Sequence, residues 1–211
     1  MLRTQLRPLY EEHRKGIDKV VQLSRAMGIK LERQITSAAS EREIMIGGPL
    51  YHKIIQIKDI ISDVLPPPMY IIETYLTAME LVDAADARAS RERIDELAKY
   101  GLKLRDGNVQ TKTPGYNERL PQWERALPND VPEEPELERL MTKASVEPAH
   151  KFFDALENRL IPATKRGDIA EAKNILRKNM LPLYEEHRKN IDLLVAAADK
   201  KFKEIERKIL E

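Results

Sequence analysis

The sequence predicts an all-α protein: an up-and-down antiparallel, four-helix-bundle-like fold with long terminal helices and a helical insertion. Charged residues make up 34% of the chain and aromatic residues only 5%, a mixture typical of long amphipathic helices. Apolar residues recur every three or four positions, which places them on one helical face. The chain also repeats itself, because residues 8–18 (PLYEEHRKGID) recur as residues 182–192 with one substitution.

Composition argues against several classes of function. The formal net charge is +1, which disfavours a nucleic-acid partner. The chain has no cysteine, so disulfides, thiolate metal sites and a cysteine nucleophile are excluded. No run approaches the roughly 18 apolar residues of a membrane span, and Met1 is followed by polar sequence rather than a signal peptide. We therefore expect a soluble chain, with any membrane spans of the parent protein outside it.

A long first helix is predicted over about residues 2–45, and it defines the first of two expected domains, 1–46 and 47–211. Its apolar stripe advances in steps of three and four residues. Gly16 and Gly28 each weaken this helix by about 1 kcal/mol relative to alanine. Packing or a partner must therefore hold it. The sequence Gly47-Gly48-Pro49 marks a break or kink before the next helix.

Lys58 falls on the apolar side of the second predicted helix, residues 50–65. It either snorkels from the edge of that face or meets an anion inside the bundle. Three consecutive prolines, 66–68, cannot continue the helix, because they lack amide donors and push the preceding residue out of the α region. A corner is expected there.

Glu73 is the only charged residue within the first part of the helix predicted over residues 69–81. A carboxylate in such apolar surroundings loses hydration and needs a donor or a cation. Two roles stay open. Glu73 caps the helix start, where the macrodipole favours negative charge, or it contacts a ligand.

Arg119 and Trp123 lie one turn apart on a short helix that begins near Tyr116, after a charged helix (87–104) and a surface loop (105–115). A guanidinium over an indole can form a platform for a small anionic or polar ligand. The alternative is a tryptophan that closes the core, with the arginine stacked outside it.

The remaining segments predict helices with defined ends. An acidic loop leads into a short helix over about 135–145, and Glu147-Pro148 begins another. Gly167 closes that helix and Asp168 caps the last one, which extends to about Leu210. Pro182 is expected to kink the last helix.

His13 and His187 occupy the same position of the repeat, and each interrupts an apolar stripe. They are either buried, hydrogen-bonded structural histidines or groups for metal or proton chemistry. Their neighbours at i±4 are leucine and isoleucine rather than further ligands. No glycine-rich phosphate loop, nucleophile elbow or HExxH motif occurs in the sequence. We therefore expect no enzyme, no metal and no cofactor.

Several segments together resemble one protein family. The most specific is 58–76 (KDIISDVLPPPMYIIETYL); the others are Tyr116 with Arg119 and Trp123, 148–153 (PAHKFF), 161–163 (IPA), Gly167-Asp168 and 184–192 (YEEHRKNID). Their order and spacing resemble the extracytoplasmic, ligand-binding helical sensor domains of bacterial methyl-accepting chemotaxis receptors. The resemblance extends from about Tyr51 to about Val195.

The resemblance implies a sensor that binds a small polar or anionic metabolite between its helices and shifts its last helix. The residues we expect to bind the ligand are Lys58, Tyr70, Glu73, Tyr75, Arg119 and Trp123. It also implies a periplasmic location, with the parent protein anchored in the membrane outside this chain. If the repeated segments contribute the same face, the first and last helices could pair about a pseudo-twofold axis or exchange partners in a homodimer, and we expect a homodimer. The rival interpretation is a structural or engineered helical-bundle module without a ligand.

The chain departs from the family at two places. Such receptors usually carry a histidine after the arginine, where this chain has Leu120. They also place a membrane helix before the first sensor helix, whereas here the first helix duplicates part of the last. Two sensor units in tandem would explain this duplication, and so would an engineered or rearranged chain.

Overall fold

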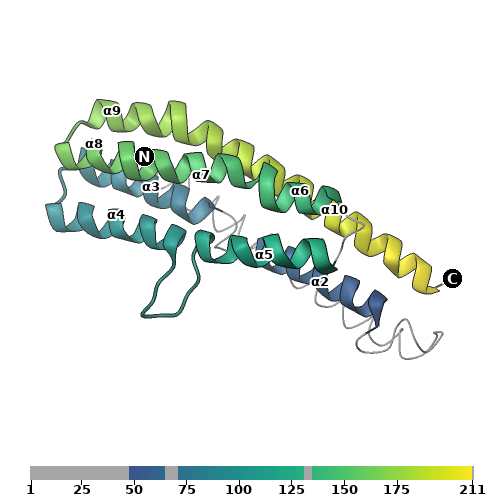
Figure 1. Ribbon diagram of the computed structural model, residues 1–211. Coiled ribbons are helices and arrows are strands. Elements are labelled where there is room, and N and C mark those ends of the chain that lie inside the picture. Colours follow the sequence, from purple (N-terminus) through teal and green to yellow (C-terminus); the bar gives the residue numbers. More distant parts are fainter. Residues whose placement is uncertain (1–47, 65–70, 131–134, 211) are drawn as a thin grey trace. The chain divides into compact units, whose positions relative to one another are not determined.

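The computed structural model describes residues 48–64, 71–130 and 135–210, and every regular element in these ranges is a helix. This confirms the all-α prediction. The helices are α2 (Pro49–Val64), α3 (Ile72–Asp86), α4 (Arg91–Asp106), α5 (Tyr116–Asp130), α6 (Pro135–Arg139), α7 (Val146–Ala155), α8 (Ile161–Arg166), α9 (Ile169–Asn174) and α10 (Leu181–Leu210) (Figure 1).

The chain divides into two compact units, which are described separately. The larger, Pro67–Ala197, contains α3 to α9 and most of α10; the smaller contains α2 and the end of α10 from Ala198. In the smaller unit Ile54, Ile57, Phe202 and Ile205 are buried. The predicted helix over 2–45, with His13 and the first copy of the repeat, lies outside the described residues, as does Tyr70.

In the larger unit, α3 and α4 lie side by side as an antiparallel pair (Figure 1). α3 starts at Ile72, three residues later than predicted, and α4 starts at Arg91 rather than at Ala87. The later start of α4 follows from local chemistry: residues 87–89 form a tight turn, and the Oγ of Ser90 caps α4 by accepting from the Arg93 amide at 3.3 Å. Gly101 allows close packing, because a Cβ there would lie 3.3 Å from Cδ2 of Leu156.

Three short π-helical segments join the later helices into two long ones. The segments η1 (Leu140–Ala144) and η2 (Leu156–Leu160) connect α6, α7 and α8, and η3 (Ile175–Met180) connects α9 to α10. Both η2 and η3 end two residues before a proline, Pro162 or Pro182. Proline cannot donate to the preceding turn and its ring clashes there, and a π turn accommodates both effects. The predicted disturbance at Pro182 therefore takes the form of η3.

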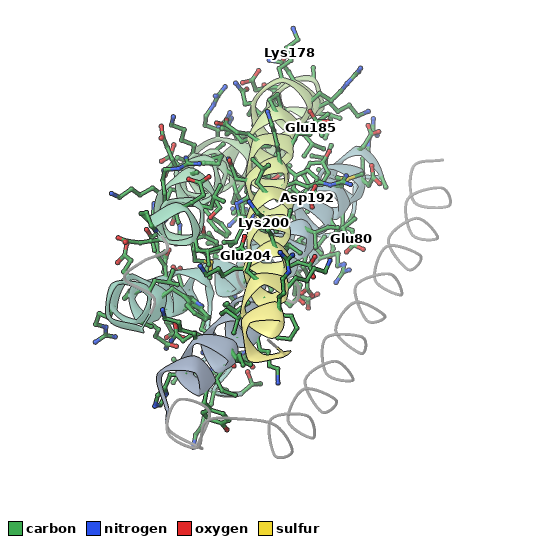
Figure 2. All side chains as sticks on the ribbon, turned by 90° about the vertical axis from the view of Figure 1, so that its right-hand side faces the viewer. Glu80, Lys178, Glu185, Asp192, Lys200 and Glu204 are labelled. Atoms are coloured by element: carbon green, nitrogen blue, oxygen red, sulfur yellow. The ribbon has the colours of Figure 1, made fainter. Side chains whose placement is uncertain are left out.

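The two predicted helix-end signals at 167 and 168 are confirmed. Gly167 has a φ of +72°, in the left-handed region, and ends α8. Asp168 caps α9, because its Oδ1 accepts from the Glu171 amide at 3.1 Å. Beyond this cap, Lys178, Glu185 and Asp192 mark an exposed, charged face of the η3–α10 helix (Figure 2). Within the described ranges, no helix combines the length and apolar character needed to cross a bilayer.

Candidate functional site

A cavity of about 330 Å³ lies beside Glu73, at the start of α3. Its other walls come from the end of α4 and from the loop that follows: Tyr100, Lys103, Leu104, Asn108, Thr111, Thr113 and Pro114. A volume of roughly 300–1,000 Å³ is typical of small-molecule sites. This cavity is therefore large enough for a small metabolite.

The carboxylate of Glu73 is held by a side chain from the neighbouring helix. The Tyr100 hydroxyl donates a hydrogen bond of 2.5 Å to Oε1 of Glu73. Glu73 also lies in the first turn of α3, where the macrodipole favours an anion, and Ile71 at the N-cap provides no side-chain cap. The position therefore suits both predicted roles, the electrostatic cap and the ligand contact.

Lys103 brings a positive charge to the same cavity. Its side chain is exposed, and it forms no salt bridge with any residue that the structure describes. Glu73 and Lys103 both line the cavity, with Leu104 and Pro114 as apolar neighbours. A carboxylate, an ammonium and apolar surface are thus available to one small ligand.

The loop at 107–115 shapes the third wall of the cavity through its own hydrogen bonds. Asn108 and Thr113 exchange backbone hydrogen bonds of 2.8 and 3.2 Å. The Oδ1 of Asn108 accepts from the Gln110 amide at 3.1 Å, an Asx turn that places the loop tip. The loop closes where Gly107, at a φ of +90°, meets the backbone of Gly115. The wall is therefore part of the folded backbone rather than a loose connection.

Tyr75, another predicted ligand residue, lies in an aromatic cluster and does not line this cavity. Its ring stacks on that of Tyr184 on α10, with 4.6 Å between centroids and 6° between planes. Phe152 on α7 meets Tyr75 edge-on at 6.2 Å. The pKa of Tyr75 is raised, mainly by its partial burial and to a lesser extent by the nearby Tyr184 and Glu185. Tyr75 therefore links α3 to α10.

Arg119 and Trp123 lie on α5, and neither lines the cavity beside Glu73. The indole of Trp123 is only 6% exposed. Nη1 of Arg119 donates to Oε1 of Gln122 at 2.9 Å. This burial favours the second role considered for the tryptophan, packing in the core, over an open ligand platform.

Lys58 is half-buried on α2 and is described with the smaller unit alone. Of the six predicted ligand residues, Glu73 is thus the one that the described part of the chain places in this cavity. The roles proposed for Lys58 and Tyr70 stay predictions.

His187 is fully buried, and its Nδ1 lies 2.7 Å from the carbonyl oxygen of Ser145. This confirms the buried, hydrogen-bonded role for that histidine. The ring of Tyr116 approaches it edge-on at 6.4 Å. Among the described residues, no three His, Asp or Glu side chains are grouped so that they could hold a metal ion.

No family model, curated protein or solved structure matches this chain.

Sequence reasoning missed Tyr100 and Lys103 because both lie on an ordinary charged helix. The signal that could have found them is topological. In a pair of antiparallel helices joined by a tight turn, residues equally distant from the turn face each other. Once the turn is placed at 87–89, Glu73 lies at the level of residues near 103.

Proposed function

We propose that this chain is a ligand-binding sensor domain of the helical, extracytoplasmic type carried by methyl-accepting chemotaxis receptors. In this proposal a small polar metabolite binds beside Glu73. The observation that carries it is the cavity in which Glu73, Tyr100 and Lys103 meet. Further support comes from the residue pattern at 58–76, the most specific part of the resemblance, because Glu73 belongs to it.

The cavity suits a ligand that carries both charges. An ammonium group on the ligand would donate to the carboxylate of Glu73, and a ligand carboxylate would accept from Lys103. Leu104 and Pro114 offer apolar contact to a short side chain. A zwitterion of amino-acid size can pair with both charges, whereas a neutral sugar can only form hydrogen bonds to them.

The stacked tyrosines offer a route from the ligand to the last helix. Tyr75 follows Glu73 by two residues on α3, and it stacks on Tyr184 of α10. A ligand that moved the start of α3 would displace this stack and bias α10 between two packings. The proposal includes the periplasmic location and the membrane-anchored parent protein that the resemblance implies, and the homodimer expected from the repeated segments.

A thermal-shift screen of the full chain against amino acids and other small metabolites, followed by calorimetry on any hit, tests this function. We expect a stabilising zwitterion. The change Glu73→Gln should weaken its binding about 10- to 100-fold, because a charge-assisted hydrogen bond contributes about 1.5–3 kcal/mol. Lys103→Gln should weaken it by a similar factor.

Glu124→Gln is the matched control, since Glu124 is an exposed carboxylate on α5 that does not line the cavity. It should bind the ligand as the parent chain does. A screen without any stabilising compound would instead favour the rival interpretation, a structural helical module that binds no ligand. Equal weakening by Glu73→Gln and Glu124→Gln would contradict the location of the site.

A further inference from the structure

A second cavity, of about 570 Å³, lies at the other end of the α3–α4 pair. It is bounded by the turn between α3 and α4 and by the turn between α8 and α9. The uncharged residues of its wall include Ala85 and Ile94, which are buried, and Thr164, whose hydroxyl donates to the carbonyl of Ile161 at 2.9 Å. Its volume lies within the range of roughly 300–1,000 Å³ for small-molecule sites.

Four cations and one carboxylate line this cavity: Arg88, Arg91, Lys165, Arg166 and Asp86. Lys165 pairs with Asp95 at 2.6 Å, and Asp86 pairs with Lys173 at 2.7 Å. Across the residues that the structure describes, the three arginines form no salt bridge. All three are exposed, so an anion in the cavity could reach their guanidinium groups without displacing a carboxylate.

The backbone at Arg88 gives an independent observation. The turns at 87–89 and 166–168 have the same hydrogen-bond pattern: Ala89 N–H donates to Ala84 O at 2.9 Å, and Asp168 N–H donates to Ala163 O at 3.0 Å. The left-handed position is Gly167 in one turn and Arg88, with a φ of +54°, in the other. Glycine adopts this conformation without strain and arginine does not. Arg88 therefore keeps its charge in the turn at a cost in strain, as Lys112 does in the loop at 107–115, where φ is also +54°.

We propose that this cavity binds a small anion with at least two negative charges on carboxylate or phosphoryl oxygens, held by Arg88, Arg91 and Arg166. The planar fork of a guanidinium matches both kinds of oxygen pair. Three such groups around one cavity exceed the need of a monoanion. The bound anion connects the α3–α4 turn to the α8–α9 turn, and so fastens two helix pairs at one end. The site is independent of the function proposed for the Glu73 cavity.

The experiment is a thermal-shift titration of the full chain with pyrophosphate and, separately, with citrate, each at constant ionic strength adjusted with sodium chloride. We expect a saturable rise of the melting temperature with at least one of them. A response to pyrophosphate alone assigns phosphoryl oxygens, and a response to citrate alone assigns carboxylates. The absence of a saturable response to both overturns the proposal.

Arg88→Gly separates binding from folding, because it relieves strain while it removes a charge. Without anion, its melting temperature should rise by about 2–4 °C. With anion, the shift should be lost, and calorimetry should show at least about tenfold weaker binding. Arg166→Gln should also weaken binding about tenfold or more, without the gain in stability.

The matched control is Arg177→Gln, since Arg177 is an exposed arginine on η3 outside the cavity. It should keep the full response, as should Glu73→Gln, which tests the other cavity. An unchanged response in both Arg88→Gly and Arg166→Gln would overturn the proposal. So would an equal loss in Arg177→Gln, because general charge screening would then explain the effect.

Discussion

The α3–α4 pair has a cavity at each end, and the two ends differ in charge and in closure. At the loop end, beside Glu73, a carboxylate and an ammonium share the cavity, and the chain is closed by the loop at 107–115. At the turn end, beside Arg88, three guanidinium groups dominate, and the chain is closed by the tight turn at 87–89. The loop end therefore suits a ligand with both charges, and the turn end suits a ligand with negative charge.

The way in which the backbone closes at each end limits which side chains fit there. At the loop end, a Cβ on Gly115 would lie 2.5 Å from the carbonyl oxygen of Arg105. The close approach of the two backbone segments therefore requires glycine at position 115. At the turn end, a Cβ on Gly167 would meet nothing within 4 Å, so only the left-handed backbone favours glycine. A charged residue can occupy such a position at a cost of about 1–2 kcal/mol, as Arg88 does.

The greatest loss of stability is expected from a substitution at the loop end. Gly115→Ala should lower the free energy of unfolding by about 3 kcal/mol, because the new methyl group overlaps the backbone of Gly107 and Arg105 and those atoms cannot rotate away. Urea denaturation measures it. The response to polyanions at the turn end should survive in the folded fraction. A loss below about 1 kcal/mol would show that the loop adjusts and that its closure is not tight.

Most of the helices could be predicted from the sequence, because their signals are local. Gly167 and Asp168 end one helix and cap the next with their own backbone and side chain, so two residues suffice to predict them. The start of α4 was harder. The segment at 87–90 has high helix propensity, and the turn depends on Arg88 adopting a conformation that propensity disfavours.

The candidate site was predictable only in part, for a physical reason. Glu73 was found because an isolated charge among apolar residues is visible in the sequence itself. Tyr100 and Lys103 lie on the neighbouring helix, and they face Glu73 only because of where the turn between α3 and α4 falls. Of the three arginines at the turn end, Arg88 lies in the α3–α4 turn, Arg91 begins α4 and Arg166 ends α8. Only the fold brings these distant segments together.

The next effect concerns Tyr116, which follows the loop directly and is fully buried. Its hydroxyl has no hydrogen-bond partner in the described part of the chain, and burial raises the pKa of its phenol. The pKa of Tyr116 is higher in the folded state than in the unfolded state. The phenol therefore does not reduce the stability of the fold below about pH 10, and it lowers that stability as the pH rises further. In the pH range where a phenol is protonated in the folded state and ionised in the unfolded state, the free energy of unfolding falls by about 1.4 kcal/mol per pH unit.

Urea unfolding between pH 7 and pH 11.5 measures this effect, and Tyr116→Phe isolates it. The variant should lose stability less steeply above about pH 10, while its stability at pH 7 should change by less than about 1 kcal/mol, since no hydrogen bond is removed. Tyr75 contributes in the same direction in both chains. Identical alkaline slopes would show that the Tyr116 phenol is not shielded from water at the loop end.

A smaller effect of defined sign is expected at Gly167. Gly167→Ala should destabilise the chain by about 1 kcal/mol, because alanine at a φ of +72° is strained although space is open. Arg88→Gly, in the turn with the same hydrogen bonds, should move stability in the opposite direction. Parallel urea curves for the two variants measure both changes. The same sign in both would contradict the equivalence of the two turns.

Asp86→Asn is expected to have the smallest effect on stability but a clear effect on anion binding. Its ion pair with Lys173 is about half exposed on both sides, so its loss should change the free energy of unfolding by less than about 0.5 kcal/mol. Asp86 is also the one carboxylate among the residues that line the cationic cavity. Its negative charge repels a bound anion even in a solvent-exposed site, so removing that charge should strengthen polyanion binding about threefold. Calorimetry on Asp86→Asn, with Glu124→Gln as the control that changes net charge equally, measures the difference. Equal strengthening in the control would assign it to net charge, whereas a gain confined to Asp86→Asn shows that the arginines bind their anion at this end of α3.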